Sequence, residues 1–159
     1  MCAIQQASEV THRHPLAVEC CIAYISVLTA LLEGKEPTDG LKSAGERITD
    51  SELRNLLCHP EVFPRDPEVW PGRGAALLTL HVALYVLTCS NNFCSGLTTA
   101  IEVGGDTDTY GAVAGGLLGA RFGVQDIPCN WHDVLIGREV MESLADKLFG
   151  LAHEQRRKT

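Results

Sequence analysis

Residues 104–122 read GGDTDTYGAVAGGLLGARF, and this stretch decides the fold class. After Tyr110, a glycine recurs at every fourth position, at Gly111, Gly115 and Gly119. Each glycine costs a helix roughly 1 kcal/mol relative to alanine, so a compensating gain is needed. At helical spacing the three glycines share one face, which lets a neighbouring backbone approach closely. We therefore predict a helix over 110–122 whose glycine face packs against another helix.

Helical patterns dominate the rest of the chain, and the period-two pattern of strands is nearly absent. Pro15 opens an apolar helix that runs from Leu16 to Glu33 and is capped by Gly34. Its apolar run contains Glu19 and falls short of a membrane span. Shorter helices are predicted over 38–49, over 51–58 with Ser51 as N-cap, over 75–88 and over 93–103, with a proline-rich loop over 59–74. The sequence therefore predicts an all-α bundle.

The last predicted helix begins at Asn130, which forms a capping box with Asp133. Its apolar stripe is Val134, Met141, Leu144 and Leu148, and residues 151–159 are predicted to be a frayed tail. The length of 159 residues predicts a single domain over 1–159.

The charge and the cysteine content of the chain indicate which partners and which cell compartment to expect. The net charge of −7 argues against nucleic acid or an anionic membrane surface as a partner. The seven cysteines are scattered without a CxxC pair, which is typical of buried thiols in a reducing compartment. Met1 to Val10 has neither the basic nor the apolar part of a signal peptide. We expect a cytoplasmic protein.

Side chains suited to chemistry are concentrated in residues 104–109, Gly-Gly-Asp-Thr-Asp-Thr. Asp106 and Asp108 supply the carboxylate oxygens that a hard cation such as Mg²⁺ prefers. The preceding glycines allow a tight turn, and the helix start offers backbone N–H groups to an anion. The simpler alternative is an ordinary helix N-cap, where Asp and Thr are favoured. Both interpretations remain open at this point.

The same residues resemble the signature of the ADP-ribosylglycohydrolase family, which includes dinitrogenase-reductase-activating glycohydrolases. The resemblance continues through Ala112–Gly116 and Ala120–Gly123. Weaker matches are Thr11–Pro15, similar to the family's Thr-His segment, and Ile127–Trp131. Together they extend from about Val10 to Phe149. The resemblance implies an orthogonal helical bundle of the ADP-ribosylglycohydrolase type, incomplete at its N-terminus and corresponding to the C-terminal half of the family domain.

The resemblance also implies a hydrolase that removes ADP-ribose from a modified side chain, commonly arginine, with two Mg²⁺ ions or with Mn²⁺ in their place. It assigns Asp106, Asp108 and Thr109 as metal ligands, and the two aspartates as catalytic residues. Candidate substrate contacts are His12, Gly104, Gly105 and Tyr110. His12 could equally have a local hydrogen-bonding role, and the Tyr110 ring could simply pack. Trp70 and Trp131 could stack on adenine or be structural.

The family's second metal motif, a Thr-Asp-Asp run, does not occur in this sequence. Asp106, Asp108 and Thr109 alone cannot complete the coordination of two Mg²⁺ ions. One hypothesis is therefore a hydrolase acting on an ADP-ribosylated protein or an ADP-ribose-like small molecule, active when another chain or a longer parent supplies the missing N-terminal half. The alternative is a crystallin-like or truncated relative that keeps the fold without activity.

Overall fold

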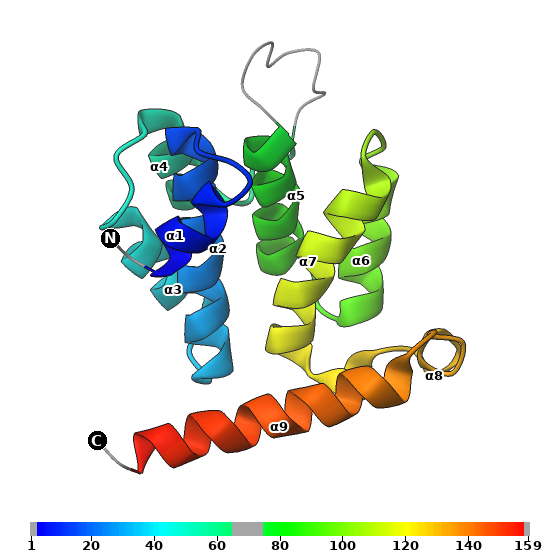
Figure 1. Cartoon of the computed structure of the whole chain (residues 1–159). Helices are drawn as coiled ribbons and strands as arrows, with labels where there is room; N and C mark the ends of the chain where they lie inside the picture. The colour runs from blue at the N-terminus through cyan, green and yellow to red at the C-terminus, as the bar shows by residue number, and fades with distance from the viewer. Residues whose placement is uncertain (1–2, 65–74, 158–159) are drawn as a thin grey trace. The chain divides into compact units, whose positions relative to one another are not determined.

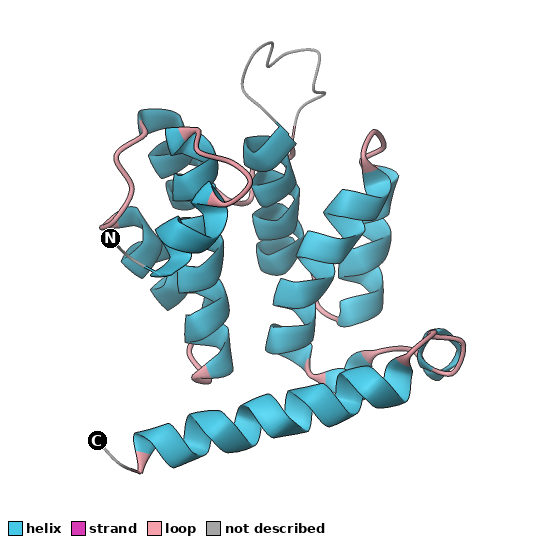
Figure 2. Cartoon of the chain, in the orientation of Figure 1, coloured by secondary structure: helices cyan, strands magenta, loops and turns pink. Residues whose placement is uncertain are grey.

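The computed structural model describes residues 3–64 and 75–157, and these form helices and turns without a strand (Figure 2). The all-α fold class predicted from the helical patterns is confirmed. The chain divides into two compact units, unit 1 (Met1–Asp126) and unit 2 (Ile127–Thr159). The sequence predicted one domain over 1–159 and gave no sign of this division.

Unit 1 contains most of the helices (Figure 1). They are α1 (Ala3–Glu9), α2 (Pro15–Leu32), α3 (Pro37–Gly45), α4 (Ser51–Cys58), α5 (Ala75–Cys89), α6 (Phe93–Glu102), α7 (Thr107–Phe122) and the 3-10 helix η2 (Val124–Asp126). Helix α7 packs against α5, α6 and α2, while α2 also contacts α1, α3 and α5. Helices α2 and α7 begin at the same end of unit 1 (Figure 1).

The core of unit 1 is built mainly by α5 and α2, and α7 adds further buried side chains. Leu84 and Leu87 from α5, and Leu117 and Leu118 from α7, are completely shielded from solvent. Burying one such side chain stabilises the fold by about 1.5–3 kcal/mol. The apolar residues that make 75–88 and 110–122 helical in the sequence therefore also hold α7 in place.

Helix α2 is long and apolar enough to cross a membrane by length and composition alone, and it is the one helix of the described residues that meets this test. In unit 1 it packs against four helices, and its buried residues include Val18, Ala23, Val27 and Leu31. Gly34, at φ 74°, follows its last turn as predicted. Its packing is that of a core helix.

The acidic residue within this apolar helix has a structural partner. The Glu19 carboxylate accepts hydrogen bonds from the backbone N–H groups of Thr49 at 3.1 Å and Asp50 at 2.9 Å, and from the Thr49 hydroxyl. Asp50, and not Ser51 as predicted, is the N-cap of α4 and accepts from the N–H groups of Glu52 and Leu53. Glu19 therefore fixes the turn that starts α4.

The glycine ladder of α7 lies against α6, but the predicted close approach of a backbone is wrong. A Cβ atom added at Gly115 would lie 3.8 Å from Leu97 Cδ1, which is ordinary contact with a side chain. Gly111 and Gly119 likewise face side chains of α6, at 3.8 Å or more. Side chains of α6 thus cover the ladder and keep the two backbones apart.

Close approach of two backbones occurs instead at Gly40 of α3. A Cβ atom at this position would lie 2.8 Å from the Cα atom of Val27 and 3.1 Å from the Cβ atom of Ala30, both in α2. Gly40 is therefore the glycine that permits the packing of α2 on α3.

Several helix boundaries differ from the prediction. Helix α3 ends at Gly45 and not at Thr49, because residues 46–50 form the turn that Glu19 caps. Helix α7 begins at Thr107, since the Tyr110 N–H already donates to the Asp106 carbonyl at 3.0 Å. The predicted helices over 51–58, 75–88 and 93–103 match α4, α5 and α6 to within one residue.

Unit 2 consists of α8 (Cys129–His132) and α9 (Arg138–Arg156). The capping box predicted at Asn130 is wrong, because Pro128 is the N-cap of α8 and α9 starts after Gly137 at φ 78°. Residues 151–156, predicted to be frayed, belong to α9. The side chains predicted as its apolar stripe are exposed: Val134 by 76%, Met141 by 47%, Leu144 by 53% and Leu148 by 66%.

Candidate functional site

The loop between α6 and α7 makes a sharp turn through two glycines. Gly104 has φ 80° and Gly105 has φ 73°, a region that side chains other than glycine rarely adopt. A Cβ atom at Gly104 would meet nothing within 4 Å, so the backbone angle and not space requires glycine there. The turn delivers Asp106 to the position directly before the first residue of α7.

Asp106 and Asp108 are both exposed, the first at the N-cap of α7 and the second in its first turn. The Asp106 carboxyl group is the main cause that holds the pKa of Asp108 below its usual range, followed by the Thr109 N–H, which donates to Asp108 Oδ1 at 3.0 Å. A lowered pKa keeps the Asp108 carboxylate ionised at neutral pH. The structure thus places two carboxyl groups together at the open end of α7.

A comparison within the chain addresses the N-cap alternative. Asp106 occupies the N-cap position of α7, yet its side chain makes no capping hydrogen bond. At the equivalent positions Asp50 accepts two backbone N–H groups, and Asn92 accepts one from Ser95. Asp106 therefore differs from the structural caps of the same protein, and its carboxyl group acts on the pKa of Asp108 instead.

Tyr110 is buried, with 3% of its surface exposed. A Cβ atom at Gly105 would lie 3.6 Å from the Tyr110 hydroxyl oxygen, so the Tyr110 side chain packs against the glycine turn. The ring of Tyr110 packs inside the protein, which agrees with the alternative of a purely structural role. Contact of Tyr110 with substrate stays a prediction. Thr109, by contrast, is exposed beside the acidic pair.

His12 is exposed in the turn between α1 and α2. Its Nδ1 atom lies 3.0 Å from the Thr11 hydroxyl, and its backbone N–H donates to the Ser8 carbonyl at 2.8 Å. These contacts fit the local hydrogen-bonding role. His12 and the Gly104–Asp106 turn lie at the same end of unit 1, because α2 and α7 both begin there (Figure 1). Contact of His12 with substrate stays a prediction.

The side chains of this loop offer the type of ligand atom, oxygen, that a hard divalent cation prefers. Two adjacent carboxyl groups and the hydroxyl of Thr109 are the ligand types that Mg²⁺ accepts together with water. Within residues 3–64 and 75–157, however, no three His, Cys, Asp or Glu side chains are grouped closely enough to hold a metal. The described residues therefore offer a partial ligand set.

The two tryptophans belong to parts of the chain other than the loop between α6 and α7. Trp131 belongs to α8 of unit 2 and is 36% exposed. Trp70 falls within 65–74, outside the described residues. Stacking of either ring on adenine stays a prediction.

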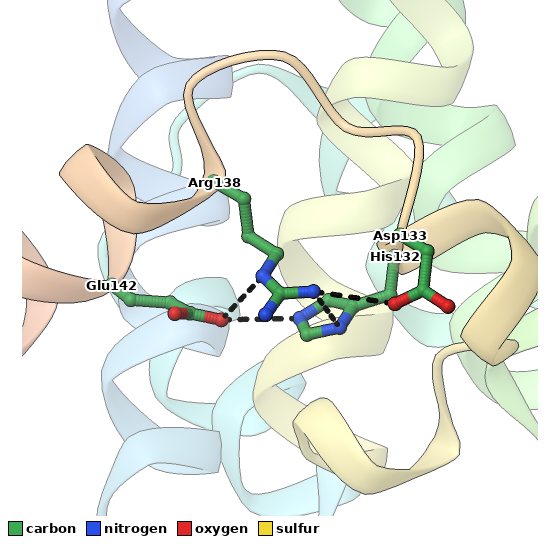
Figure 3. Close-up of polar contacts among 4 residues, drawn as sticks. All are labelled: His132, Asp133, Arg138 and Glu142. Atoms are coloured by element: carbon green, nitrogen blue, oxygen red, sulfur yellow. Dashed lines mark hydrogen bonds and ion pairs between the residues drawn. The ribbon is translucent and has the colours of Figure 1, made fainter.

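A polar cluster in unit 2 was not foreseen from the sequence (Figure 3). Arg138 Nη1 lies 3.3 Å from Asp133 Oδ1, and Arg138 Nε lies 3.3 Å from Glu142 Oε1. His132 Nε2 lies 3.2 Å from the same oxygen of Glu142. The i,i+4 spacing of Arg138 and Glu142 was the available signal. The cluster joins the end of α8 to the first turn of α9.

The helical fold and an acidic pair on a glycine turn define a class of all-α protein with a candidate cation site. The family model for ADP-ribosylglycohydrolases matches residues 2–158, and the chain belongs to this family.

Three relatives illustrate the similarity. The chain is 31% identical over 150 residues to the ADP-ribosyl-[dinitrogen reductase] glycohydrolase of Rhodospirillum rubrum, covering 91% of this chain and 47% of that protein. It is 28% identical to the ADP-ribosylarginine hydrolase Tri1 of Pseudomonas putida, covering 91% of this chain and 38% of that one. It is 34% identical to the ADP-ribosylhydrolase ARH3 of Mus musculus, covering 69% and 34%.

The chain therefore spans less than half the length of these relatives. The narrower prediction, that it corresponds to the C-terminal half only, is not borne out, because the family model matches nearly the whole chain.

Proposed function

We propose that this chain forms part of an ADP-ribosylglycohydrolase that removes ADP-ribose from a modified arginine side chain. The substrate class follows from relatives named for ADP-ribosylarginine and for ADP-ribosylated dinitrogen reductase. Within the proposed enzyme, the chain contributes Asp106, Asp108 and Thr109 to a magnesium site. The glycosidic bond to the acceptor is the bond cleaved.

One observation carries the assignment of the site. The Asp106 carboxyl group stands at a helix N-cap without capping the helix, and it lowers the pKa of the neighbouring Asp108. The helix does not use the Asp106 carboxyl group, so this group and the neighbouring Asp108 carboxylate are both available as oxygen ligands for a hard cation. A site for Mg²⁺ explains why such a pair stands where a single capping aspartate would suffice.

Each residue of the loop then has a role in binding. Asp106 and Asp108 would hold magnesium through carboxylate oxygens, and Thr109 would add its hydroxyl. Gly104 and Gly105 shape the turn that places Asp106 directly before the first residue of α7. When bound, magnesium orients the ribose hydroxyls and stabilises the charge that develops as the glycosidic bond breaks.

The ligand set is completed, in this proposal, by polypeptide outside these 159 residues. The reason is the partial set of donors in the described residues and the coordination number of magnesium. The assembled enzyme is here the chain together with the rest of an ADP-ribosylglycohydrolase domain, in one longer polypeptide or as two chains.

A second candidate function is a relative that keeps the fold without catalysis. The observation in its favour is the same partial ligand set in the described residues. It predicts that magnesium has no effect on any form of the protein.

Thermal melting of the assembled enzyme, with and without millimolar Mg²⁺, separates the two candidates. A ligand that binds only the folded state raises the melting temperature. We expect Mg²⁺ to raise the melting temperature of the wild type, and Asp106→Ala and Asp108→Asn each to abolish the shift. Asp146→Asn, an exposed acidic position in α9, is the matched control and should keep it. A wild-type protein without any shift refutes the magnesium site and leaves the non-catalytic candidate.

A further inference from the structure

One residue of α2 makes a specific polar contact with α7. The Tyr24 hydroxyl donates a hydrogen bond to the carbonyl oxygen of Val113 at 3.1 Å, across 89 positions of sequence. Burial raises the pKa of Tyr24, so the hydroxyl keeps its proton at neutral pH and remains a donor. This contact ties the middle of α2 to the middle of α7.

Gly116 provides the space in which this hydroxyl lies. A Cβ atom added at Gly116 would overlap the Tyr24 hydroxyl oxygen, while it would lie 3.7 Å from Tyr24 Cζ. An alanine at this position is therefore incompatible with the hydroxyl but compatible with the ring. The neighbouring Gly115 has no such conflict, because a Cβ atom there meets Leu97 Cδ1 at 3.8 Å.

The two helices joined by Tyr24 carry the candidate site residues at their N-terminal ends. Asp106 and Asp108 lie at the start of α7, and His12 lies just before α2. Both helices begin at the same end of unit 1 (Figure 1). A helix is stiff along its axis, so sliding or rotation of α2 against α7 moves His12 relative to the acidic pair. The hydrogen bond of Tyr24 adds a directional restraint to the apolar contacts between the two helices, which are not directional.

We propose that Tyr24 is a positioning residue of the hydrolase. Its hydroxyl, seated over Gly116 and bonded to Val113, fixes the register of α2 against α7 and thereby the position of Asp106 and Asp108 relative to His12. This inference rests on the proposed function. It adds a residue far from the glycine turn to those on which hydrolysis depends.

Four versions of the assembled enzyme test the inference: wild type, Tyr24→Phe, Gly116→Ala and the double variant. Their melting temperatures test the contact. We expect Gly116→Ala to lower the melting temperature of the wild type but not that of Tyr24→Phe, because the phenyl ring leaves room for the added methyl group. Tyr85→Phe, which removes a half-buried hydroxyl from α5, is the matched control.

Hydrolysis of ADP-ribosylarginine with Mg²⁺ tests the positioning role. We expect Tyr24→Phe to lower kcat roughly tenfold or more with a smaller change in KM, since misplacement of about 1 Å can cost up to a hundredfold. The double variant should recover the melting temperature of Tyr24→Phe yet keep its low kcat. Tyr85→Phe should match the wild type.

The outcomes separate this inference from the proposed function. A wild-type enzyme that does not hydrolyse the substrate refutes the proposed function and the inference with it. An active wild type whose Tyr24→Phe variant keeps the wild-type kcat and KM overturns the inference alone. So does a kcat that follows the melting temperature across the four versions, because Tyr24 would then contribute stability only.

Discussion

A pair of glycine-to-alanine substitutions tests the packing of unit 1. Gly40 and Gly115 both lie inside helices, and alanine is the better helix former at each. At Gly115 the new methyl group meets Leu97 Cδ1 at 3.8 Å, which needs no adjustment. At Gly40 it would lie 2.8 Å from the Val27 Cα atom and 3.3 Å from the Val27 carbonyl oxygen, so α2 or α3 must move.

The helix-propensity gain of up to about 1 kcal/mol applies to both substitutions. Overpacking adds a cost of roughly 1–3 kcal/mol at Gly40 alone. We therefore expect Gly115→Ala to keep or raise the free energy of unfolding, and Gly40→Ala to fall below it by about 1–3 kcal/mol. Urea unfolding followed by circular dichroism measures both values, provided that the denaturant slopes agree. Equal stabilities of the two variants would refute the assignment of Gly40 as the close approach.

Three further predictions concern single side chains. Burial lowers the pKa of His81, in α5, below its ordinary value of 6.5. As the pH drops through about 6.5, the unfolded chain therefore binds a proton before the folded one does, and the free energy of unfolding falls. Urea midpoints measured against pH should show this fall, and His81→Gln should reduce it. Asp50→Ala should cost about 1 kcal/mol because two capping bonds are lost, whereas Asp106→Ala should not destabilise the metal-free protein; an equal loss for both would restore the N-cap interpretation of Asp106. Arg138→Met should speed hydrogen exchange in the first turn of α9 while leaving unit 1 unchanged, and unchanged exchange throughout would show that the cluster of Figure 3 does not hold α9.

Much of the fold could be predicted because its signals are local. Pro15 and Gly34 bracket α2 in the sequence as in the structure, and the apolar spacing of 75–88 gives α5. The misses depend on partners distant in sequence. Glu19 reaches the turn before α4, so the N-cap falls at Asp50 and α3 ends early. Gly40 is a lone glycine whose importance comes from Val27 of another helix, while the conspicuous ladder of α7 meets only side chains.

The candidate site divides in the same way. Two consecutive glycines predict a turn from residue type alone, and Gly104 and Gly105 do form one, directly before Asp106. Whether an aspartate at a helix start caps the helix depends on backbone and side-chain angles that the sequence does not contain. The position of the Tyr110 side chain could not be predicted either, because only the folded structure shows that it packs against Gly105. The role of Tyr24 could not be predicted from its local sequence. Its hydroxyl meets Val113 and Gly116 only when α2 packs on α7 in the folded protein.

Release of ADP-ribose from ADP-ribosylarginine by the assembled enzyme is the most direct test of the proposed function. The expected result is hydrolysis that requires Mg²⁺, that is lost when the metal is chelated, and that Asp108→Asn abolishes while the fold stays intact. An amide is a much poorer ligand than a carboxylate for a hard cation. Asp146→Asn should retain full activity. Hydrolysis that persists in Asp108→Asn, or an assembled wild type that releases no ADP-ribose at saturating Mg²⁺, would contradict the account.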